Sequence, residues 1–167
     1  MKRIPGVLVL VLCLAALPAW AARKEKPTGK EIADKAKAAK LDPANAIIGE
    51  KEGKKIKLTP ADLSHVKTEA ELEDGQMIGV LETEVAGDET PLLPGKYNLF
   101  LTKVGNDWHV YAESEGKIVA EAVRVKMEEA KEKKKPEFVP EGWCLAYLKY
   151  PCWRAGLPAI CTWWICF

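Results

Sequence analysis

The chain has 167 residues, with 25 lysines and arginines, 24 aspartates and glutamates and a formal net charge of +1. This near-neutral balance argues against a nucleic-acid partner, which normally requires a basic face. The length favours one domain with appendages, because two substantial hydrophobic cores need a longer chain.

Residues 1–21 have the composition of a secretory signal peptide. Lys2 and Arg3 precede an apolar run at residues 7–17, and Ala21 provides a small residue at a cleavage position. The run is about half the roughly 20 residues that span a bilayer, so we expect removal rather than retention. We therefore predict export, with a periplasmic or extracellular location. Cleavage after Ala21 leaves 23 basic and 24 acidic side chains.

Residues 22–43 are predicted to form a charged helical spacer. Thr28 and Glu31 have the spacing of a capping box, in which each side chain bonds a free backbone amide at the start of a helix. Ile32 is the only large apolar residue of this helix, which leaves it little to bury. A solvated spacer is therefore favoured over an interaction helix.

Residues 44–127 are predicted to form the β domain. Tyr97, Leu99 and Leu101 are spaced two residues apart and so share one face of a strand. The last strand changes parity near Ala122, which indicates a bulge or bend there. Residues 59–62 have the pattern of a helix start with a proline in the first turn. Strands are expected at residues 46–49, 54–58, 76–85, 95–104, 107–114 and 117–127.

Turns between these short segments favour a mainly β fold, a small antiparallel β-sandwich or partly open barrel. Residues 128–142 are charged and contain prolines, which is typical of a linker. Residues 143–167 form a tail rich in cysteine and tryptophan. The expected order is signal peptide, helical spacer, β-sandwich, linker and disulfide-rich C-terminal tail.

The string "LLPGKYNLFL" at residues 92–101 resembles a motif of secreted prealbumin-like modules, which are also called transthyretin-like and include carboxypeptidase-regulatory-like domains. Pro94 and Gly95 provide a turn, and Tyr97 then enters the core strand. The resemblance extends over about residues 76–127. It implies a β-sandwich that serves adhesion, domain pairing or carbohydrate contact and is mostly non-catalytic.

Catalytic candidates are few. The two histidines are His65 and His109, and no HExxH, GxSxG or P-loop motif accompanies them. The carboxylates are spread through turns and charged runs, where they usually serve solubility. We predict no enzymatic activity, no metal site and no cofactor. A small secreted hydrolase or inhibitor that uses a histidine is the alternative.

The cysteines divide into one in the leader, Cys13, and four in the tail. An even number in an exported protein predicts disulfides, and the absence of CxxC disfavours both zinc and thiol catalysis. Three connectivities are possible. A nested hairpin is favoured, with a break in register that we place at Pro151. The four tail cysteines are Cys144, Cys152, Cys161 and Cys166.

Three roles are open to the tail tryptophans. They cover the sheet, they form a stapled surface that contacts a carbohydrate or an envelope protein, or they enter a membrane interface with Lys149 and Arg154 near lipid phosphates. The sequence favours an exported, non-catalytic binding or structural module with the tail as its contact surface. Association with a membrane interface is an alternative. The tryptophans are Trp143, Trp153, Trp163 and Trp164.

Overall fold

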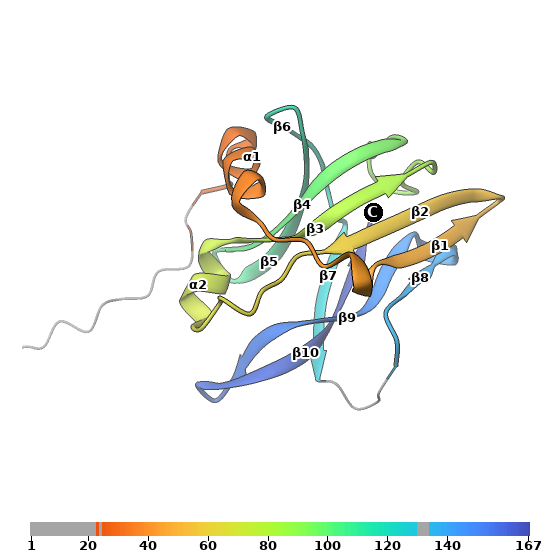
Figure 1. Ribbon diagram of the computed structural model, residues 1–167. Helices are drawn as coiled ribbons and strands as arrows, with labels where there is room; N and C mark the ends of the chain where they lie inside the picture. Colours follow the sequence, from red (N-terminus) through yellow and green to blue (C-terminus); the bar gives the residue numbers. More distant parts are fainter. Residues whose placement is uncertain (1–22, 24, 130–133) are drawn as a thin grey trace, which may run out of the picture.

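The structure is a computed structural model that describes residue 23, residues 25–129 and residues 134–167. It contains two antiparallel sheets that pack against each other, with two short helices beside the first sheet (Figure 1). The predicted mainly β, sandwich-like fold is confirmed. The predicted signal peptide at residues 1–21 lies outside the described residues.

The first sheet is a six-stranded meander in which each strand pairs with the next along the chain. Tight turns with positive φ at Gly53, Gly105 and Gly116 connect three of the strand pairs. The prediction of a meander is therefore correct. Its strands are β1 (Ile47–Lys51), β2 (Lys54–Pro60), β3 (Gln76–Thr83), β4 (Gly95–Val104), β5 (Asp107–Ser114) and β6 (Lys117–Glu121).

The second sheet contains four strands in the order β7-β10-β9-β8. The cysteine- and tryptophan-rich tail supplies its two central strands, while the region expected to be a linker supplies β8 and a short 3-10 helix at Pro140–Gly142. Its strands are β7 (Arg124–Glu129), β8 (Glu137–Val139), β9 (Cys144–Arg154) and β10 (Leu157–Cys166).

The chain passes from one sheet to the other between Ala122 and Val123. The Ala122 amide donates to the carbonyl of Val110 in the first sheet, at 2.9 Å. The Val123 amide donates to the carbonyl of Cys166 in the second sheet, also at 2.9 Å. This crossover explains the change of side-chain parity near Ala122. At the opposite side of the sandwich, Gly49 lies against Phe138, so that a Cβ at residue 49 would lie 2.5 Å from that of Phe138.

Apolar side chains from both sheets form one continuous core. Tyr150 from β9 reaches across it, and its hydroxyl donates to the carbonyl of Ile78 at 2.9 Å. Burial raises the pKa of this phenol well above its ordinary value. The tail therefore contributes directly to the core between the sheets. The largest fully buried side chains facing it include Leu58, Leu81, Trp143, Trp163 and Phe167.

Helix α1 (Gly29–Ala38) packs on the outer face of the first sheet. The Thr28 hydroxyl accepts from the Glu31 amide at 3.2 Å, as the predicted cap requires. Ile32 is fully buried in a small cluster with Met77, Phe100 and Tyr111, so the helix is docked rather than a solvated spacer. One isoleucine suffices because the sheet supplies the other large apolar groups, which the spacing within the helix does not reveal.

An ion pair secures the N-terminal side of this helix. The two terminal guanidinium nitrogens of Arg23 donate to the carboxylate of Glu31, Nη1 at 2.9 Å. These hydrogen bonds hold the pKa of Glu31 below its ordinary value, in spite of partial burial. The pair therefore stabilises the folded state above the pKa of the unfolded carboxyl, and this contribution is lost as the pH falls through the folded-state pKa.

The substitution Glu31→Gln is expected to lower the free energy of unfolding at pH 7. It should have little effect at about pH 2, where the Glu31 carboxyl is protonated in the folded and in the unfolded protein. Urea unfolding at the two pH values measures this difference. Glu89→Gln, on an exposed loop, is the control and should leave both values unchanged. If Glu31→Gln lowers the free energy of unfolding by the same amount at both pH values, the ionic explanation is contradicted.

A second helix, α2 (Glu69–Asp74), follows a complete capping box. The Thr68 hydroxyl accepts from the Glu71 amide, and the Glu71 carboxylate accepts from the Thr68 amide. The helix start expected at residues 59–62 is wrong, because Pro60 is the last residue of β2. Proline lacks a backbone N–H, which is tolerated at a strand end as readily as in a first helical turn, so the pattern at residues 59–62 fits both structures.

Candidate functional site

Two disulfides connect β9 and β10, in the nested arrangement that the sequence favoured. Cys144 and Cys166 lie directly opposite each other, with their Cα atoms 4.0 Å apart. Cys152 and Cys161 are diagonal neighbours, with their Cα atoms 5.8 Å apart. The hairpin turns at Ala155 and Gly156, both of which have positive φ.

A bulge in β9 separates the two disulfides. Trp163 lies opposite Leu148 and Ile165 opposite Leu145, so that Ala146 and Tyr147 together face Trp164. Tyr147 has a φ of 57°, a conformation that costs energy for any residue except glycine. The break in register therefore lies at residue 147. The predicted position at Pro151 is wrong, since residue 151 pairs regularly with Ile160.

The four tail tryptophans divide into a buried pair and a half-buried pair. Trp143 and Trp163 have no exposed surface and lie inside the core. Trp153 and Trp164 are half-buried. Because a ligand from solvent reaches only an accessible ring, Trp153 and Trp164 are the two that offer a contact surface. Strand alternation explains why the neighbours at 163 and 164 differ.

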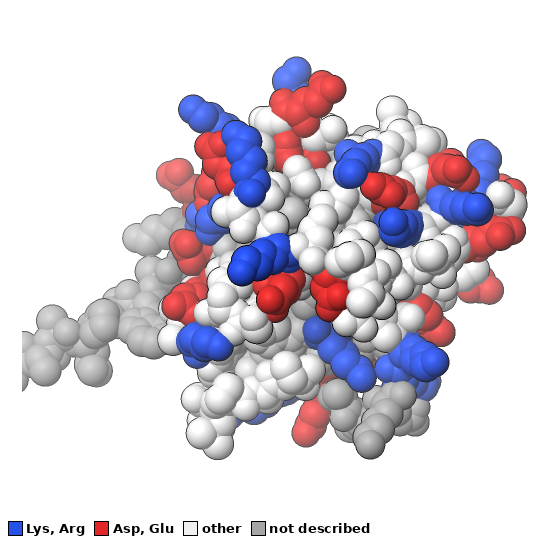
Figure 2. Space-filling view, in the orientation of Figure 1, with Lys and Arg blue, Asp and Glu red and all other residues white. Residues whose placement is uncertain are grey.

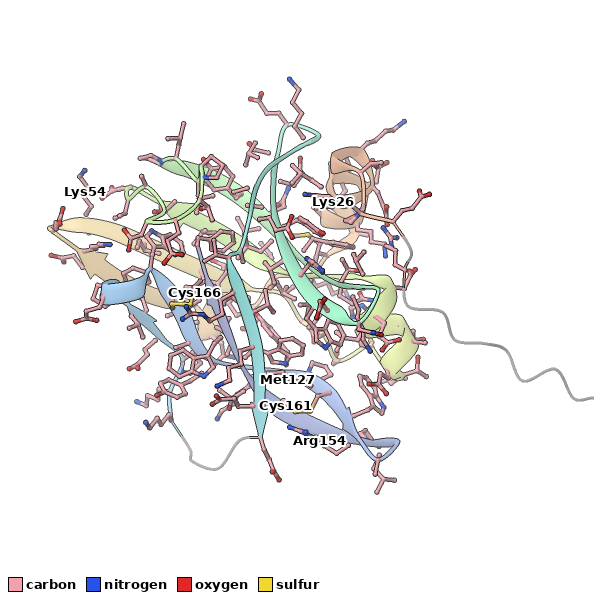
Figure 3. The ribbon with its side chains drawn as sticks, turned by 180° about the vertical axis from the view of Figure 1, so that it is seen from behind. Lys26, Lys54, Met127, Arg154, Cys161 and Cys166 are labelled. Carbon is pink, nitrogen blue, oxygen red and sulfur yellow. A yellow bond between two sulfur atoms is a disulfide. The ribbon has the colours of Figure 1, made fainter. Side chains whose placement is uncertain are left out.

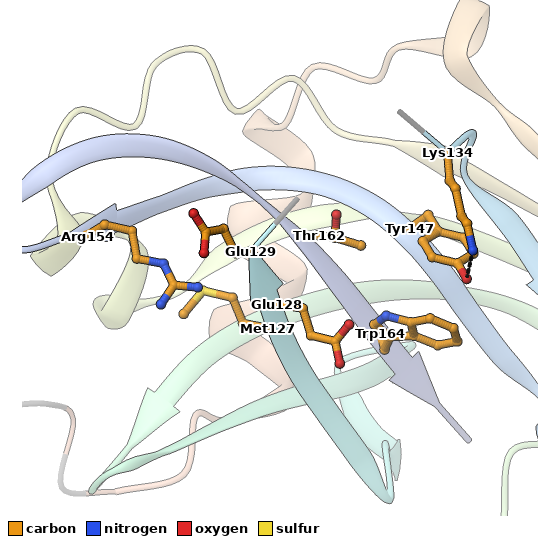
Figure 4. A pocket seen from close by; sticks show the side chains of 8 residues that line it. All are labelled: Met127, Glu128, Glu129, Lys134, Tyr147, Arg154, Thr162 and Trp164. Atoms are coloured by element: carbon orange, nitrogen blue, oxygen red, sulfur yellow. Dashed lines mark hydrogen bonds between the residues drawn. The ribbon is translucent and has the colours of Figure 1, made fainter. Parts of the chain in front are cut away.

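Trp164 lines an open groove of about 580 Å³ on the outer side of the second sheet (Figure 4). The groove runs across β7, β10 and β9, and Lys134 forms one side of it. Sequence reasoning identified only Trp164 and, for another role, Arg154. The complete lining is Met127, Glu128, Glu129, Lys134, Tyr147, Arg154, Thr162 and Trp164.

Two aromatic rings meet in this groove. The centroids of Tyr147 and Trp164 lie 4.8 Å apart in an edge-to-face arrangement. Lys134 donates to the Tyr147 hydroxyl at 3.1 Å, and its Nζ lies 4.8 Å from the ring centroid (Figure 4). The bulge at residue 147 brings the tyrosine beside Trp164, which is the effect of its unusual backbone conformation.

The indole Nε1–H of Trp164 is buried and has no hydrogen-bond partner among the described residues. A buried donor without an acceptor costs about 1–3 kcal/mol. Trp143 and Trp163 also carry unsatisfied indole nitrogens, but their rings belong to the closed core. Of the three, only the Trp164 ring lines the groove.

Polar groups of both signs surround the rings. Glu128 and Glu129 come from β7, and Arg154 lies at the end of β9. In the strand ladder Thr162 lies between Glu128 and Lys149. The groove therefore combines carboxylate acceptors, hydroxyl and cationic donors and an aromatic surface. This set suits the recognition of a neutral, polyhydroxylated ligand by stacking and hydrogen bonds.

The two histidines lie apart from the groove and have different partners. His65 is exposed in the loop before α2, with its ring nitrogens near the Asp62 carbonyl and the Gln76 side chain. His109 on β5 contacts the Glu121 carboxylate at 2.7 Å and stacks on Tyr111. The structure does not bring the histidines into a shared set of contacts.

Glu121 also accepts from Lys26 at 2.8 Å. Burial acts to raise the pKa of Glu121, but the hydrogen bonds from Lys26 and His109 outweigh it and keep that pKa below its ordinary value. These contacts tie the segment before α1 to the first sheet. They account structurally for His109.

No group of three or more histidine, cysteine, aspartate or glutamate side chains in the described part of the chain is arranged to hold a metal ion. Nor does any helix within those same residues have the length and apolar character needed to cross a membrane. Comparisons of the chain with protein family models, with curated proteins and with solved structures found no match.

Proposed function

We propose that the protein is an exported, non-catalytic binding module that holds a carbohydrate in the groove of the second sheet. The observation that carries this proposal is the half-buried Trp164 ring, which lines the groove edge-to-face with Tyr147 and keeps part of its surface accessible. A sugar face stacks on the accessible part of the ring, while its hydroxyls form hydrogen bonds with the carboxylates and cations of the lining.

The lining residues support a neutral glycan over a strongly charged ligand. Two carboxylates and two cations line the groove together with the rings, so hydroxyl groups find both acceptors and donors. The resemblance of residues 92–101 to prealbumin-like modules is in line with this role, since such modules include carbohydrate-contacting members.

Binding is tested by affinity electrophoresis through gels that contain one soluble neutral polysaccharide each, from a panel of β-glucan, mannan, galactan and xylan. The wild type is expected to be retarded by at least one of them. Trp164→Ala should weaken that retardation by about tenfold or more, because central aromatic anchors dominate binding energy. Near-UV circular dichroism establishes that the variant is folded.

Trp153→Ala is the matched control, because it removes a half-buried tryptophan of the same hairpin outside the groove lining. It should leave retardation unchanged. The groove would be rejected as a carbohydrate site if no polysaccharide retards the wild type, or if the two variants lose retardation equally.

Export is supported by the composition of residues 1–21 and by the two disulfides, which persist in oxidising compartments. Intact mass of protein recovered from a secreting host tests it. The expected mass is that of a chain that begins at Ala22. Its four cysteines should become alkylated only after reduction. A mass that retains residues 1–21, or four reactive thiols without reduction, would contradict export.

A further inference from the structure

The end of the β9–β10 hairpin extends beyond the strands that flank it. Among the residues that the structure describes, β8 pairs with β9 only at residues 144–146, and β7 pairs with β10 only at residues 161–166. The rest of the hairpin is a two-stranded ribbon, which projects at the lower left of Figure 1. The hairpin tip, defined here as residues 151–160, lies on this ribbon.

Large apolar side chains are exposed on the hairpin tip. Leu157 is 69% exposed and Ile160 is 59% exposed. Because they are three residues apart in a strand, they point to opposite faces of the ribbon. A flat protein partner would cover one face, whereas a lipid layer entered by the tip surrounds both.

The β9–β10 hairpin as a whole, residues 144–166, carries positively charged side chains and no negatively charged ones. Lys149 and Arg154 are its charged residues, and residues 142–167 contain no aspartate or glutamate. The carboxylates of β7 stop at Glu129, which lies opposite Cys161 at the base of the ribbon. Figure 2 shows the projecting lobe largely free of charge, and Figure 3 shows Arg154 beside it. Arg154 lies opposite Leu157 beside the turn, and Lys149 lies opposite Thr162 nearer the core. An apolar end flanked by cations complements an anionic lipid surface.

Proline reduces the number of free amides along the ribbon. In a two-residue hairpin the pair that flanks the turn is hydrogen-bonded, so the pairs Trp153–Pro158 and Pro151–Ile160 are the ones whose amides point outward. Two of these four positions are proline and carry no N–H. Fewer unpaired donors lower the cost of moving the ribbon into a less polar layer, and they also prevent pairing with another strand.

The Cys152–Cys161 disulfide closes the base of the tip. It links β9 to β10 at the level where the pairing of β10 with β7 ends. Trp153 lies at this level, half-buried and partly packed against the core. Tryptophan favours the zone between headgroups and acyl chains, so its position fits a tip that enters only the outer part of a lipid layer.

From this combination we propose that the hairpin tip is a lipid-surface anchor, in which Leu157 and Ile160 enter the interfacial layer of an anionic membrane while Lys149 and Arg154 contact lipid phosphates. The anchor is separate from the carbohydrate groove, which shares only Arg154 with it. It attaches the module to a surface without a transmembrane segment.

Flotation with vesicles tests this anchor. The folded protein is expected to float with vesicles of phosphatidylcholine and phosphatidylglycerol in a 7:3 ratio, and much less with phosphatidylcholine alone. The double variant Leu157→Ser, Ile160→Ser should lose tenfold or more of its partitioning, roughly the effect of burying even one large apolar side chain. Lys149→Gln, Arg154→Gln should lose only the preference for anionic vesicles, and salt should mimic it.

The matched control is the double variant Ile48→Ser, Leu93→Ser, which removes side chains of comparable exposure, 70% and 65%, outside the tip. Its flotation should equal that of the wild type, as should that of Trp164→Ala. A wild type that stays at the bottom with both vesicle types would overturn the anchor. So would equal losses in the two serine pairs, or a tip variant that instead converts a wild-type dimer into a monomer.

Discussion

Replacing Trp163 with alanine is expected to lower the free energy of unfolding by about 3–5 kcal/mol. The ring has no exposed surface, and it meets Trp108 of the first sheet edge-to-face with centroids 5.1 Å apart. The substitution thus removes the contact between β10 and β5 and leaves a cavity between the two sheets. Urea unfolding followed by far-UV circular dichroism measures the loss, because tryptophan fluorescence itself changes in the variant.

The adjacent residue provides a stringent control. Trp164 lies on the opposite face of β10 and is half-buried, so Trp164→Ala is expected to cost about 1–2 kcal/mol. Equal losses for the two variants would contradict the assignment of faces in β10. Should Trp163→Ala fail to fold, Trp163→Phe keeps most of the apolar volume and should show a smaller but measurable loss.

The two disulfides are expected to have the next largest effects. In the chain-entropy description, a link across 22 residues contributes roughly 3.5 kcal/mol and one across 9 residues roughly 2.5 kcal/mol. We expect the paired variant Cys144→Ala, Cys166→Ala to be destabilised more than Cys152→Ala, Cys161→Ala. Because the loops are nested, each link shortens the loop that the other closes, so the two links together should contribute less than the sum of these two isolated values.

Urea unfolding of the oxidised wild type, the two paired variants and the reduced wild type measures these differences. The Cys152–Cys161 disulfide adds a local effect, because it is the disulfide nearer the hairpin tip, where β9 and β10 pair with each other and with no other described strand. Amide exchange at Arg154 and Ala159, whose amides belong to the hydrogen-bonded pairs of the ribbon, should therefore quicken when the Cys152–Cys161 disulfide is removed and not when the Cys144–Cys166 disulfide is removed. If the variant without the Cys144–Cys166 disulfide is more stable than the variant without the Cys152–Cys161 disulfide, the entropic ranking is refuted.

Local patterns in the sequence predicted much of the first sheet. Alternation in residues 95–114 and turn residues between them identify strands, because a half-buried strand presents its two faces with a period of two. The parity change at Ala122 correctly indicated a break, yet its cause, a crossover between sheets, depends on Cys166, which is distant in the sequence. The Thr68–Glu71 capping box was a local signal that sequence reasoning missed.

The candidate site was less predictable for a physical reason. Sequence alternation places Trp163 and Trp164 on opposite faces, but only the pairing of β10 with β7 and β9 determines which face is covered. Glu128 and Tyr147 join Trp164 through that pairing, and no spacing along the chain relates them. The bulge at Tyr147 likewise has no proline or glycine to mark it, so proline chemistry drew attention to residue 151 instead.

The order of strands along the chain has a consequence for folding. The six-stranded sheet pairs neighbours in sequence, so its contacts are local and form as soon as each hairpin is complete. Its inner apolar face, however, is covered mainly by β9 and β10, which follow all six strands in the chain. During synthesis the nascent meander therefore passes through a stage with an uncovered apolar face, when it is most prone to aggregate and most dependent on a chaperone.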